Sequence, residues 1–317
     1  RTAGFFRSGV YKKEVLEDDM ERIKNFYKQA GYLDVKPNFE LIFQEKARKK
    51  WIELAVRIEE GRKYITGSIK FSGNAVFSEE EVKALLKMKS GDTFTEEGLH
   101  TDVGSVQEHY FDKGYIMARV RPDTILNMET DRVDITYAVT EGEVAYVNKI
   151  NIRGNTKTKD IVIRRELRMQ PGERYDGAKL KRSKERLYNL GYFEDITFDT
   201  EETAEPGKRD MVVDVKEAKT GEFSFGGGFS SIDKLIGFVE VEQKNFDMLN
   251  FPTFTGDGQD LKVRGEFGST RKNYLLSWTE PWIFDKPLSF GFDLYASEQN
   301  KSGSTGYAYD EKRNGGD

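Results

Sequence analysis

The chain has 317 residues, of which 37% are hydrophobic and 33% are charged, and its formal net charge is −5. This balance fits two or three small folded modules with solvated surfaces and excludes a bundle of membrane-spanning helices. The acidic net charge argues against nucleic-acid binding. The lack of cysteine excludes disulfide bonds, a thiolate nucleophile and cysteine metal ligands. Because neither His100 nor His109 lies in a catalytic or zinc-binding motif, we predict no enzyme, no metal site and no cofactor.

The chain begins with Arg1-Thr2, without a methionine or an apolar signal segment, so we expect it to have been processed or cut. No stretch approaches the roughly 18 consecutive apolar residues of a membrane-spanning helix. Any membrane span is therefore expected to consist of strands, because only helices and closed sheets satisfy their backbone groups in lipid.

Three copies of one module follow each other in the sequence. Gly73-Asn74, after an apolar strand, recurs as Gly154-Asn155, and Gly91-Asp92 recurs as Gly172-Glu173 at the same spacing. Such self-similarity is typical of tandem supersecondary units. A Gly-Tyr pair marks each copy and begins at Gly31, Gly114 and Gly191.

The first module, residues 1–64, shows only the later part of the pattern. A helix is expected at Glu17–Ala30, followed by strands at Tyr32–Phe43 and Trp51–Glu59. Its opening strand and helix are missing, which we expect of a shortened copy.

The second module, residues 65–147, is complete. Ser78 with Glu81 three residues later has the spacing of a capping box, which predicts a helix start. Gly114 is expected to end the second helix, since glycine tolerates a positive φ. The predicted elements are a strand at Ile69–Phe71, helices from Ser78 and from Thr95, and strands at Tyr115–Arg121 and Asp131–Glu141.

The third module, residues 148–220, repeats this β-α-α-β-β order. Its predicted elements are a strand at Lys149–Arg153, helices at Thr158–Arg168 and Asp176–Leu190, and strands at Phe193–Asp199 and Met211–Glu217. Each module is thus expected to form a three-stranded sheet with two helices on one face.

Such a sheet leaves an edge strand open to pairing. A partner peptide can add a strand to an open edge, or the edge can be solvated and protected, here by Arg119 and Arg121. The sequence leaves both interpretations open. The candidate binding residues are Tyr115, Ile116, Met117, Ala118, Arg119 and Val120 in the second module, and Phe193, Glu194, Asp195, Ile196, Thr197 and Phe198 in the third.

From Thr220-Gly221 onward, apolar and polar residues alternate and helical periodicity ends. Five segments of about 9–11 residues have one aromatic or aliphatic face and one polar or glycine face, as in strands that cross a membrane. A soluble β-sandwich is the alternative, since its strands also alternate. A membrane barrel needs at least about 8 strands, so we expect residues 221–317 to be the first strands of an unfinished barrel.

Gly226-Gly227-Gly228 resembles a phosphate-binding loop only superficially. Neither a Lys-Ser/Thr pair nor a helix follows it, so the phosphate-loop mechanism has no support. Glycine at these positions more plausibly allows close packing or bending of a strand.

Taken together, these residues resemble a known family. The modules, with Phe71-Ser72-Gly73-Asn74 and Gly91-Asp92-Thr93-Phe94, look like polypeptide-transport-associated (POTRA) repeats. The segments Gly221–Phe229 and Thr279–Phe284 resemble the opening barrel strands of BamA-type proteins. The expected fold class is therefore α+β: tandem POTRA repeats followed by antiparallel strands of an incomplete transmembrane β-barrel.

The resemblance implies a bacterial outer-membrane protein with a 16-stranded barrel and periplasmic repeats, which folds and inserts other barrel proteins without ATP or a cofactor. It implies unfolded outer-membrane β-barrel proteins, accessory periplasmic lipoproteins and outer-membrane lipid as partners, and no nucleic acid. It also implies that the first barrel strand is one side of a seam where client strands pair. The candidate seam residues are Phe223, Ser224, Phe225, Gly226, Gly227, Gly228 and Phe229.

Other functions fit parts of the sequence. A two-partner secretion pore or a translocation-and-assembly module would share both repeats and barrel. A soluble periplasmic scaffold is disfavoured by the alternating aromatic C-terminal third. RNA binding is disfavoured by the acidic charge and by the lack of an aromatic strand that could stack bases.

Overall fold

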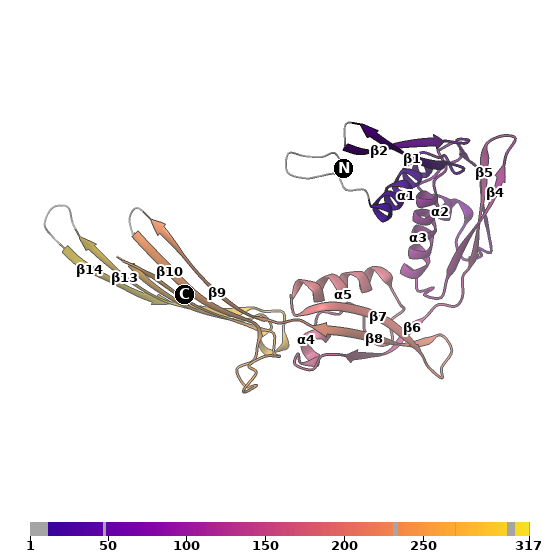
Figure 1. Cartoon of the computed structure of the whole chain (residues 1–317). Coiled ribbons are helices and arrows are strands. Elements are labelled where there is room, and N and C mark those ends of the chain that lie inside the picture. Colours follow the sequence, from indigo (N-terminus) through magenta and orange to yellow (C-terminus); the bar gives the residue numbers. More distant parts are fainter. Residues whose placement is uncertain (1–11, 47–48, 231–233, 270, 303–307, 317) are drawn as a thin grey trace. The chain divides into compact units, whose positions relative to one another are not determined.

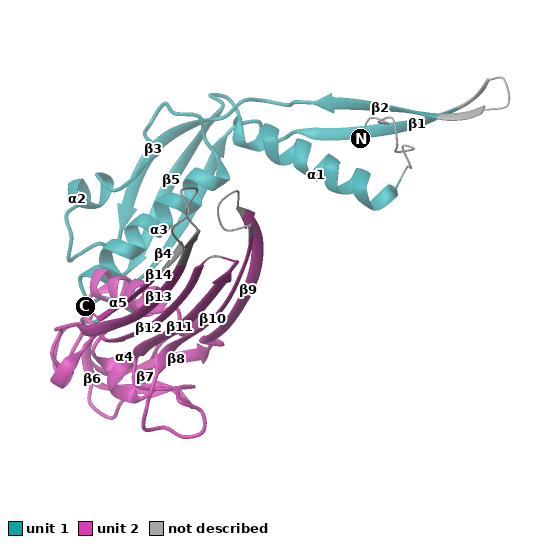
Figure 2. Ribbon diagram, turned by 90° about the vertical axis from the view of Figure 1, so that its left-hand side faces the viewer, with its two compact units in different colours: residues 1–144 teal, residues 145–317 magenta. Residues whose placement is uncertain are grey.

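The computed structural model describes residues 12–46, 49–230, 234–269, 271–302 and 308–316 (Figure 1). The chain divides into two compact units, residues 1–144 and 145–317 (Figure 2). In the described part of the chain, no helix combines the length and apolar character needed to cross a membrane. The first eleven residues of the predicted first module lie outside the described residues.

The first module contains one helix and an antiparallel hairpin. Its elements are α1 at Lys13–Gln29, β1 at Lys36–Lys46 and β2 at Lys49–Glu59. The expected order of one helix and two strands is confirmed, although the first strand begins at Lys36 and not at Tyr32. Tyr32 instead forms an isolated bridge to Lys63, near the end of the same module.

The second module has the expected β-α-α-β-β order. Its sheet order is β3-β5-β4, with β3 parallel and β4 antiparallel to the central β5. The elements are β3 at Ile65–Ser72, α2 at Glu79–Lys83, α3 at Glu96–Asp112, β4 at Arg119–Asn127 and β5 at Arg132–Thr140.

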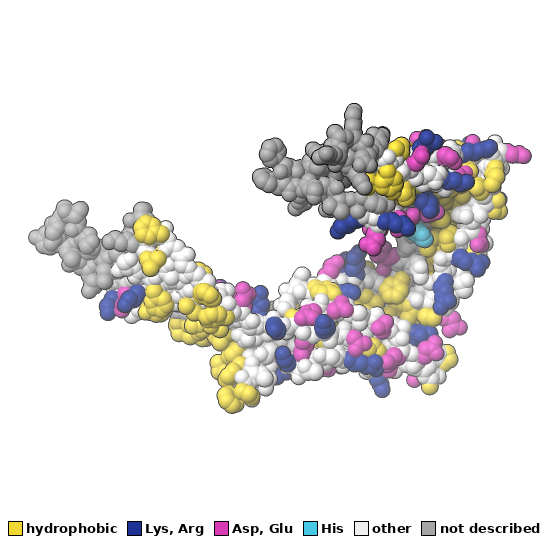
Figure 3. Space-filling model, viewed as in Figure 1, with side chains coloured by type: hydrophobic (Ala, Val, Ile, Leu, Met, Phe, Trp, Pro, Cys, Tyr) yellow, Lys and Arg dark blue, Asp and Glu magenta, His cyan; other side chains and the backbone are white. Residues whose placement is uncertain are grey.

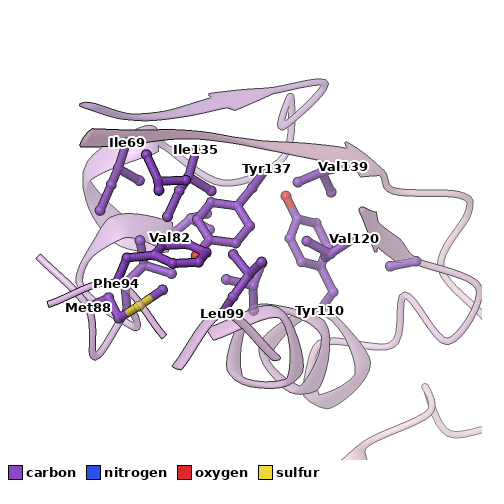
Figure 4. Packing of buried hydrophobic residues seen from close by; sticks show 14 of the residues in the cluster. Ile69, Val82, Met88, Phe94, Leu99, Tyr110, Val120, Ile135, Tyr137 and Val139 are labelled. Carbon is purple, nitrogen blue, oxygen red and sulfur yellow. The ribbon is translucent and has the colours of Figure 1, made fainter. Parts of the chain in front are cut away.

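The core of this module lies between β5 and the helices. Ile135 and Tyr137 of β5 are 1% and 0% exposed and share one cluster with Tyr110 of α3 (Figure 4). Burying side chains of this size stabilises the fold by about 1.5–3 kcal/mol each. The Thr95 hydroxyl caps α3 at its predicted start by accepting a hydrogen bond from the backbone N–H of Gly98 at 3.0 Å.

The predicted strand Tyr115–Arg121 begins four residues later, at Arg119. Tyr115 to Ala118 form a turn, in which the Ala118 N–H donates to the Tyr115 carbonyl at 3.0 Å. Tyr115 is held there by edge-to-face contacts of its ring with Phe77 and Tyr110, both at 6.0 Å. The aromatic cluster therefore overrides the strand pattern read from the sequence.

The third module has the same topology, with sheet order β6-β8-β7. Its first helix is shorter than predicted and ends at Arg164. The reason is that the Glu166 and Leu167 N–H groups donate to carbonyls three residues back, which tightens the helix into turns. The elements are β6 at Tyr146–Arg153, α4 at Asp160–Arg164, α5 at Gly177–Asn189, β7 at Phe193–Glu202 and β8 at Lys208–Glu217.

The repeated Gly-Asn turn has a steric cause. Gly73 and Gly154 have φ of +80° and +83°, and a Cβ atom on either would lie 2.2 Å or 2.0 Å from a carbonyl oxygen of the neighbouring strand, that of Val139 or Val215. The central strand therefore approaches so closely that only glycine fits, which explains why the same residue marks both modules.

Replacing Gly73 by alanine is expected to destabilise the second module by about 3 kcal/mol, because positive φ and a backbone clash add. Urea denaturation followed by circular dichroism measures the loss. Gly104→Ala in α3 is the matched control, since a Cβ there meets nothing within 4 Å; it is expected to be neutral or to stabilise by up to about 1 kcal/mol. Equal effects of the two substitutions would contradict the steric explanation.

The C-terminal part forms one antiparallel sheet with its strands in sequence order, not closed into a barrel. Six strands are described where five were expected. The missed strand, β14, carries mostly polar residues and so lacks the alternation that marks the others. The strands are β9 at Gly221–Ser230, β10 at Lys234–Phe246, β11 at Gln259–Gly268, β12 at Arg271–Glu280, β13 at Phe290–Ser302 and β14 at Ala308–Gly316.

The two faces of this sheet differ in chemistry. On the polar face, the Lys262 ammonium and the Arg264 guanidinium each lie 3.2 Å from the Glu240 carboxylate. The strand register places apolar residues together on the opposite face, here called the apolar face. It includes Phe223, Phe225, Phe229, Leu235, Val239, Val241, Val263, Phe267, Leu276, Trp278, Phe292 and Leu294.

Candidate strand-pairing edges

β9 forms one edge of the six-stranded sheet, with β10 as its neighbour. Just before β9, the Lys244 N–H donates to the Thr220 carbonyl at 3.0 Å, in the register that continues along the two strands. Bonded and non-bonded pairs alternate in an antiparallel sheet. Even-numbered residues of β9 therefore bond to β10, and odd-numbered residues direct their N–H and C=O groups to the free edge. These residues are Phe223, Phe225, Gly227 and Phe229.

The same three phenylalanines are strongly exposed on the apolar face, at 64%, 76% and 81% for Phe223, Phe225 and Phe229. Of the glycines between them, Gly226 and Gly227 have close neighbours on β10, whereas a Cβ on Gly228 would meet nothing within 4 Å. A Cβ on Gly226 would lie 2.7 Å from the ring of Phe238 on β10. β9 is thus an edge strand with free backbone groups and an apolar surface.

The edge of the third module, β7, is partly occupied by its own side chains. The Ile196 N–H donates to the Asp195 carboxylate at 2.9 Å and to the Tyr188 hydroxyl at 3.3 Å. A backbone N–H held in this way does not bond to β8 and points to the free edge. Acidic residues such as Glu194 and Glu201 lie within this strand, and charged side chains on an edge strand oppose pairing. Phe193 and Ile196 are buried, so they are not available to a partner.

The edge strand of the second module, β4, contains only Arg119 and Val120 of the predicted binding residues. Tyr115, Ile116, Met117 and Ala118 precede the strand, and Ala118 is 3% exposed. Within β4, Pro122 has no N–H, and a proline is tolerated in a strand where its nitrogen faces away from the neighbour. The free edge of β4 therefore lacks a donor near its middle.

The opposite edges of both repeat sheets are covered at their starts by the recurring Gly-Asp and Gly-Glu pairs. The Thr66 N–H donates to the Asp92 carbonyl at 2.7 Å, and the Gly91 N–H donates to the Thr66 carbonyl at 2.8 Å. In the third module, Gly172 and Glu173 bond Val147 in the same way. The repeated pairs therefore protect the starts of β3 and β6.

A buried joint between the third module and the turn joining β10 to β11 was not predicted. The Asn245 amide donates to the Thr158 hydroxyl at 2.9 Å, and its oxygen accepts from the Gly258 N–H at 2.9 Å. Asn245 is 1% exposed and has φ of +56°. Its partner Thr158 is 87 positions away in the chain, and no local pattern signals such a contact.

Lys159 extends this joint. Its ammonium lies 2.8 Å from both Asp247 and Asp257, and its backbone N–H donates to the Gly256 carbonyl at 2.8 Å. Gly256 has to be glycine here, because a Cβ would lie 2.4 Å from the Lys157 carbonyl oxygen. The turn is therefore fixed to the third module by backbone and side-chain bonds together.

Glu217 at the end of β8 fixes the same segment from the other side. Its carboxylate accepts from the Thr158 N–H at 2.7 Å and from the Thr156 hydroxyl at 2.8 Å. Burial alone would raise the pKa of the Glu217 carboxyl, but hydrogen bonds from Thr158, Thr156 and Lys157 hold that pKa below its ordinary value. The charged form of Glu217 is therefore the one that the fold stabilises.

This lowered pKa predicts a pH dependence. The stabilisation from Glu217 is present above the unfolded-state pKa of about 4.3 and is lost as the pH falls through the lower folded-state value. Glu217→Gln is expected to cost about 1–2 kcal/mol at neutral pH and to flatten the loss of stability as the pH falls below about 4.3. Unfolding measured across this range checks the expectation, and an unchanged pH profile in the variant would contradict it.

Comparison with known families covers most of the chain. A POTRA family model, described as a surface antigen variable number repeat, matches residues 1–61, 64–142 and 145–218. An Omp85 superfamily domain model matches residues 253–317. A protein of Neisseria meningitidis serogroup B named outer membrane protein assembly factor BamA is 31% identical over 91% of this chain and 35% of its own length. The chain belongs to the BamA-type family of outer-membrane proteins.

Other BamA-type proteins show the same match. A BamA from Nitratidesulfovibrio vulgaris is 29% identical over 93% of this chain and 36% of its own length. The chain thus spans about a third of the length of these relatives. A crystal structure of BamA from Haemophilus ducreyi lacking POTRA domains 1–3 superimposes with a TM-score of 0.68 at 27% identity, covering 80% of this chain and 47% of that one. The predicted family, its fold and its outer-membrane location with periplasmic repeats are confirmed.

The predicted module boundaries at 64/65, 147/148 and 220/221 and the binding roles of the three edges remain predictions. Among the described residues, no cluster of three His, Cys, Asp or Glu side chains is placed to hold a metal ion. The three predicted edges belong to three different sheets.

Proposed function

We propose that this BamA-type chain helps to fold and insert outer-membrane β-barrel proteins, and that the free edge of β9 pairs with strands of these clients. The observation that carries the proposal is the alternation along β9. Four residues from Phe223 to Phe229 direct unshared backbone groups to the edge, and three of them place aromatic rings on the apolar face.

Pairing at this edge has a physical rationale. An unpaired backbone group in hydrocarbon costs several kcal/mol, so a strand must be paired as it enters the bilayer. A preformed edge supplies hydrogen bonds to the backbone of any client, which makes pairing tolerant of sequence. Insertion of a client strand would therefore proceed by exchange of backbone hydrogen bonds. We infer that it requires no chemical step, cofactor or nucleotide.

The repeats fit a weaker, transient role. The β7 edge offers free positions beyond Ile196, and the self-bonded Ile196 N–H would have to be released before a client strand could extend along it. We infer that β4 and β7 hold clients briefly in the periplasm and that accessory lipoproteins bind elsewhere on the repeats. Asp195→Ala with Tyr188→Phe frees the N–H and is expected to raise photo-crosslinking of clients to Thr197. Unchanged crosslinking would remove β7 from the proposal.

A photo-reactive residue at Phe229 in the full-length protein, in cells, tests the main proposal. Adducts with many newly made barrel proteins are expected, because the site lies on the free edge. Val263 on β11 is the control. It is also exposed on the apolar face, but β11 is hydrogen-bonded to a strand on each side. One dominant secreted partner would point to a secretion pore, and equal adducts at both positions would show that the edge has no special role.

A further inference from the structure

The turn between β10 and β11 has a buried base and an exposed tip. Asn245, Phe246 and Asp247 on one side and Thr255, Gly256 and Gly258 on the other are buried. The seven residues between them, Met248 to Phe254, are all exposed and carry no charge. In a chain with 33% charged residues, an uncharged exposed segment of this kind needs an explanation.

The side chains of this tip are apolar and large. Met248, Leu249 and Phe251 are 61%, 89% and 79% exposed. Figure 3 shows hydrophobic side chains gathered over this turn, at the base of the sheet, and continuing along the strands. Exposed apolar patches on soluble surfaces are normally small, and larger ones mark an interaction surface.

The tip is also supported from below. The Phe251 ring packs edge-to-face on Phe254 at 5.6 Å, and Phe254 stacks on the buried Phe246 at 6.2 Å. The two acidic residues that flank the tip, Asp247 and Asp257, are both paired with Lys159. The apolar residues are therefore presented on a fixed base whose charges are already compensated.

The next turn at the same end of the sheet repeats the pattern. It joins β12 to β13 and exposes Phe284 at 85% and Leu288 at 62%. Because strand direction alternates, this turn and the β10–β11 turn both lie at the end where the third module enters β9. Two neighbouring turns thus expose apolar side chains on the periplasmic rim.

We propose that the tip Met248–Phe254 inserts into the inner leaflet of the outer membrane and holds the joint of the third module at the bilayer surface. The occupant of the patch is the acyl-chain and headgroup boundary of the lipid. The patch is continuous with the apolar face, which lies against lipid in an outer-membrane protein. A segment that contains Phe and Leu and no charged residue suits this boundary. The inference concerns the membrane and goes beyond the proposed pairing of client strands.

In this arrangement the β10–β11 turn would connect the lipid directly to the third module. The tip rests on Phe246 and Asp247, and Asn245 and Lys159 bond the same turn to the third module. Insertion of the tip fixes the depth of this module against the membrane, so the β9 edge begins at the lipid surface.

A spin label at position 249 tests the proposal in the full-length protein, reconstituted in phospholipid nanodiscs. The described chain has no cysteine, so Leu249→Cys in a full-length background without other cysteines gives one labelled site. Leu249 is 89% exposed, and its replacement is therefore expected to leave the fold intact. The ratio of collisions with oxygen, which partitions into lipid, to collisions with a water-soluble nickel chelate reports immersion.

The label at 249 is expected to give a ratio several-fold above that at Glu205→Cys, in the exposed β7–β8 turn, and close to that at Phe225→Cys on the apolar face. A ratio equal to that at 205 would overturn the proposal by placing the tip in water. A label that collides with neither reagent would also overturn the insertion proposal, because it would show that a protein partner covers the tip. Neither result depends on whether β9 pairs with clients, so the two proposals fail separately.

Discussion

Replacing Asn245 by alanine is expected to loosen the joint between the third module and the sheet by about 2–4 kcal/mol. The substitution leaves the buried Gly258 N–H without its acceptor and the Thr158 hydroxyl without its donor, each of which is costly in a buried site. It also puts alanine at φ of +56°, a conformation that asparagine tolerates better. Hydrogen exchange of the Gly258 and Lys159 amides measures the loss, as roughly a tenfold increase in rate for each 1.4 kcal/mol.

Asn245→Gly separates the two causes. Glycine accepts the positive φ but also loses both side-chain hydrogen bonds, so its effect is expected to be about 1–2 kcal/mol smaller than that of alanine. If alanine leaves exchange at both amides unchanged, Asn245 does not hold the joint. If glycine and alanine are equivalent, the hydrogen bonds alone account for the effect and backbone strain does not.

Replacing Phe225 by proline is expected to lower the assembly of client barrels by a factor of about ten or more. Proline removes the N–H that Phe225 directs to the free edge, and its ring obstructs the approach of a second backbone. The hydrogen bonds to β10 come from Ser224 and Gly226, so the sheet keeps its pairing. Reconstituted assembly of a barrel client in liposomes measures the rate, and circular dichroism verifies that the variant is folded.

Phe225→Leu is the matched control. Leucine keeps the backbone N–H and an apolar side chain on the same face, so assembly is expected to stay within about twofold of the parent. A proline variant that is folded and assembles clients at the parental rate would contradict pairing at this edge. Equal losses in both variants would assign the effect to the aromatic ring.

Local patterns in the sequence predict the fold well because each module carries its own signals. Gly73 and Gly154 mark turns that no other residue fits, and the cap at Thr95 starts a helix where expected. Alternation predicts strands wherever one face is apolar, as at Phe223 and Phe225. The same rule fails for β14, whose faces are both polar, so alternation carries no signal there.

The site was less predictable because its determinants are non-local. Tyr115 belongs to a strand by its neighbours in sequence, but contacts with Phe77 and Tyr110 hold it in a turn. Ile196 looks like an open edge residue until Asp195 and Tyr188 are seen to hold its N–H. Asn245 and Thr158 meet only through the tertiary fold, so no periodicity in either segment announces the joint.

A hydrogen bond connects the segment that carries the joint with the segment that leads into the β9 edge. Lys244, one residue before Asn245, bonds to Thr220 at the start of β9. The turn that Asn245 fixes to the third module is therefore hydrogen-bonded to the residue that precedes the free edge.

Disulfide mapping of a client stalled during insertion tests the central claim most directly. Cysteines are placed singly along β9, from Phe223 to Phe229, and singly along one strand of the client. If the edge pairs with that strand, one client position links to one β9 position, and moving the client cysteine by two residues moves the linked β9 position by two, because directly opposite residues alone come within disulfide distance. Links that ignore register, or that form equally well from Val263 on β11, would contradict pairing at the β9 edge.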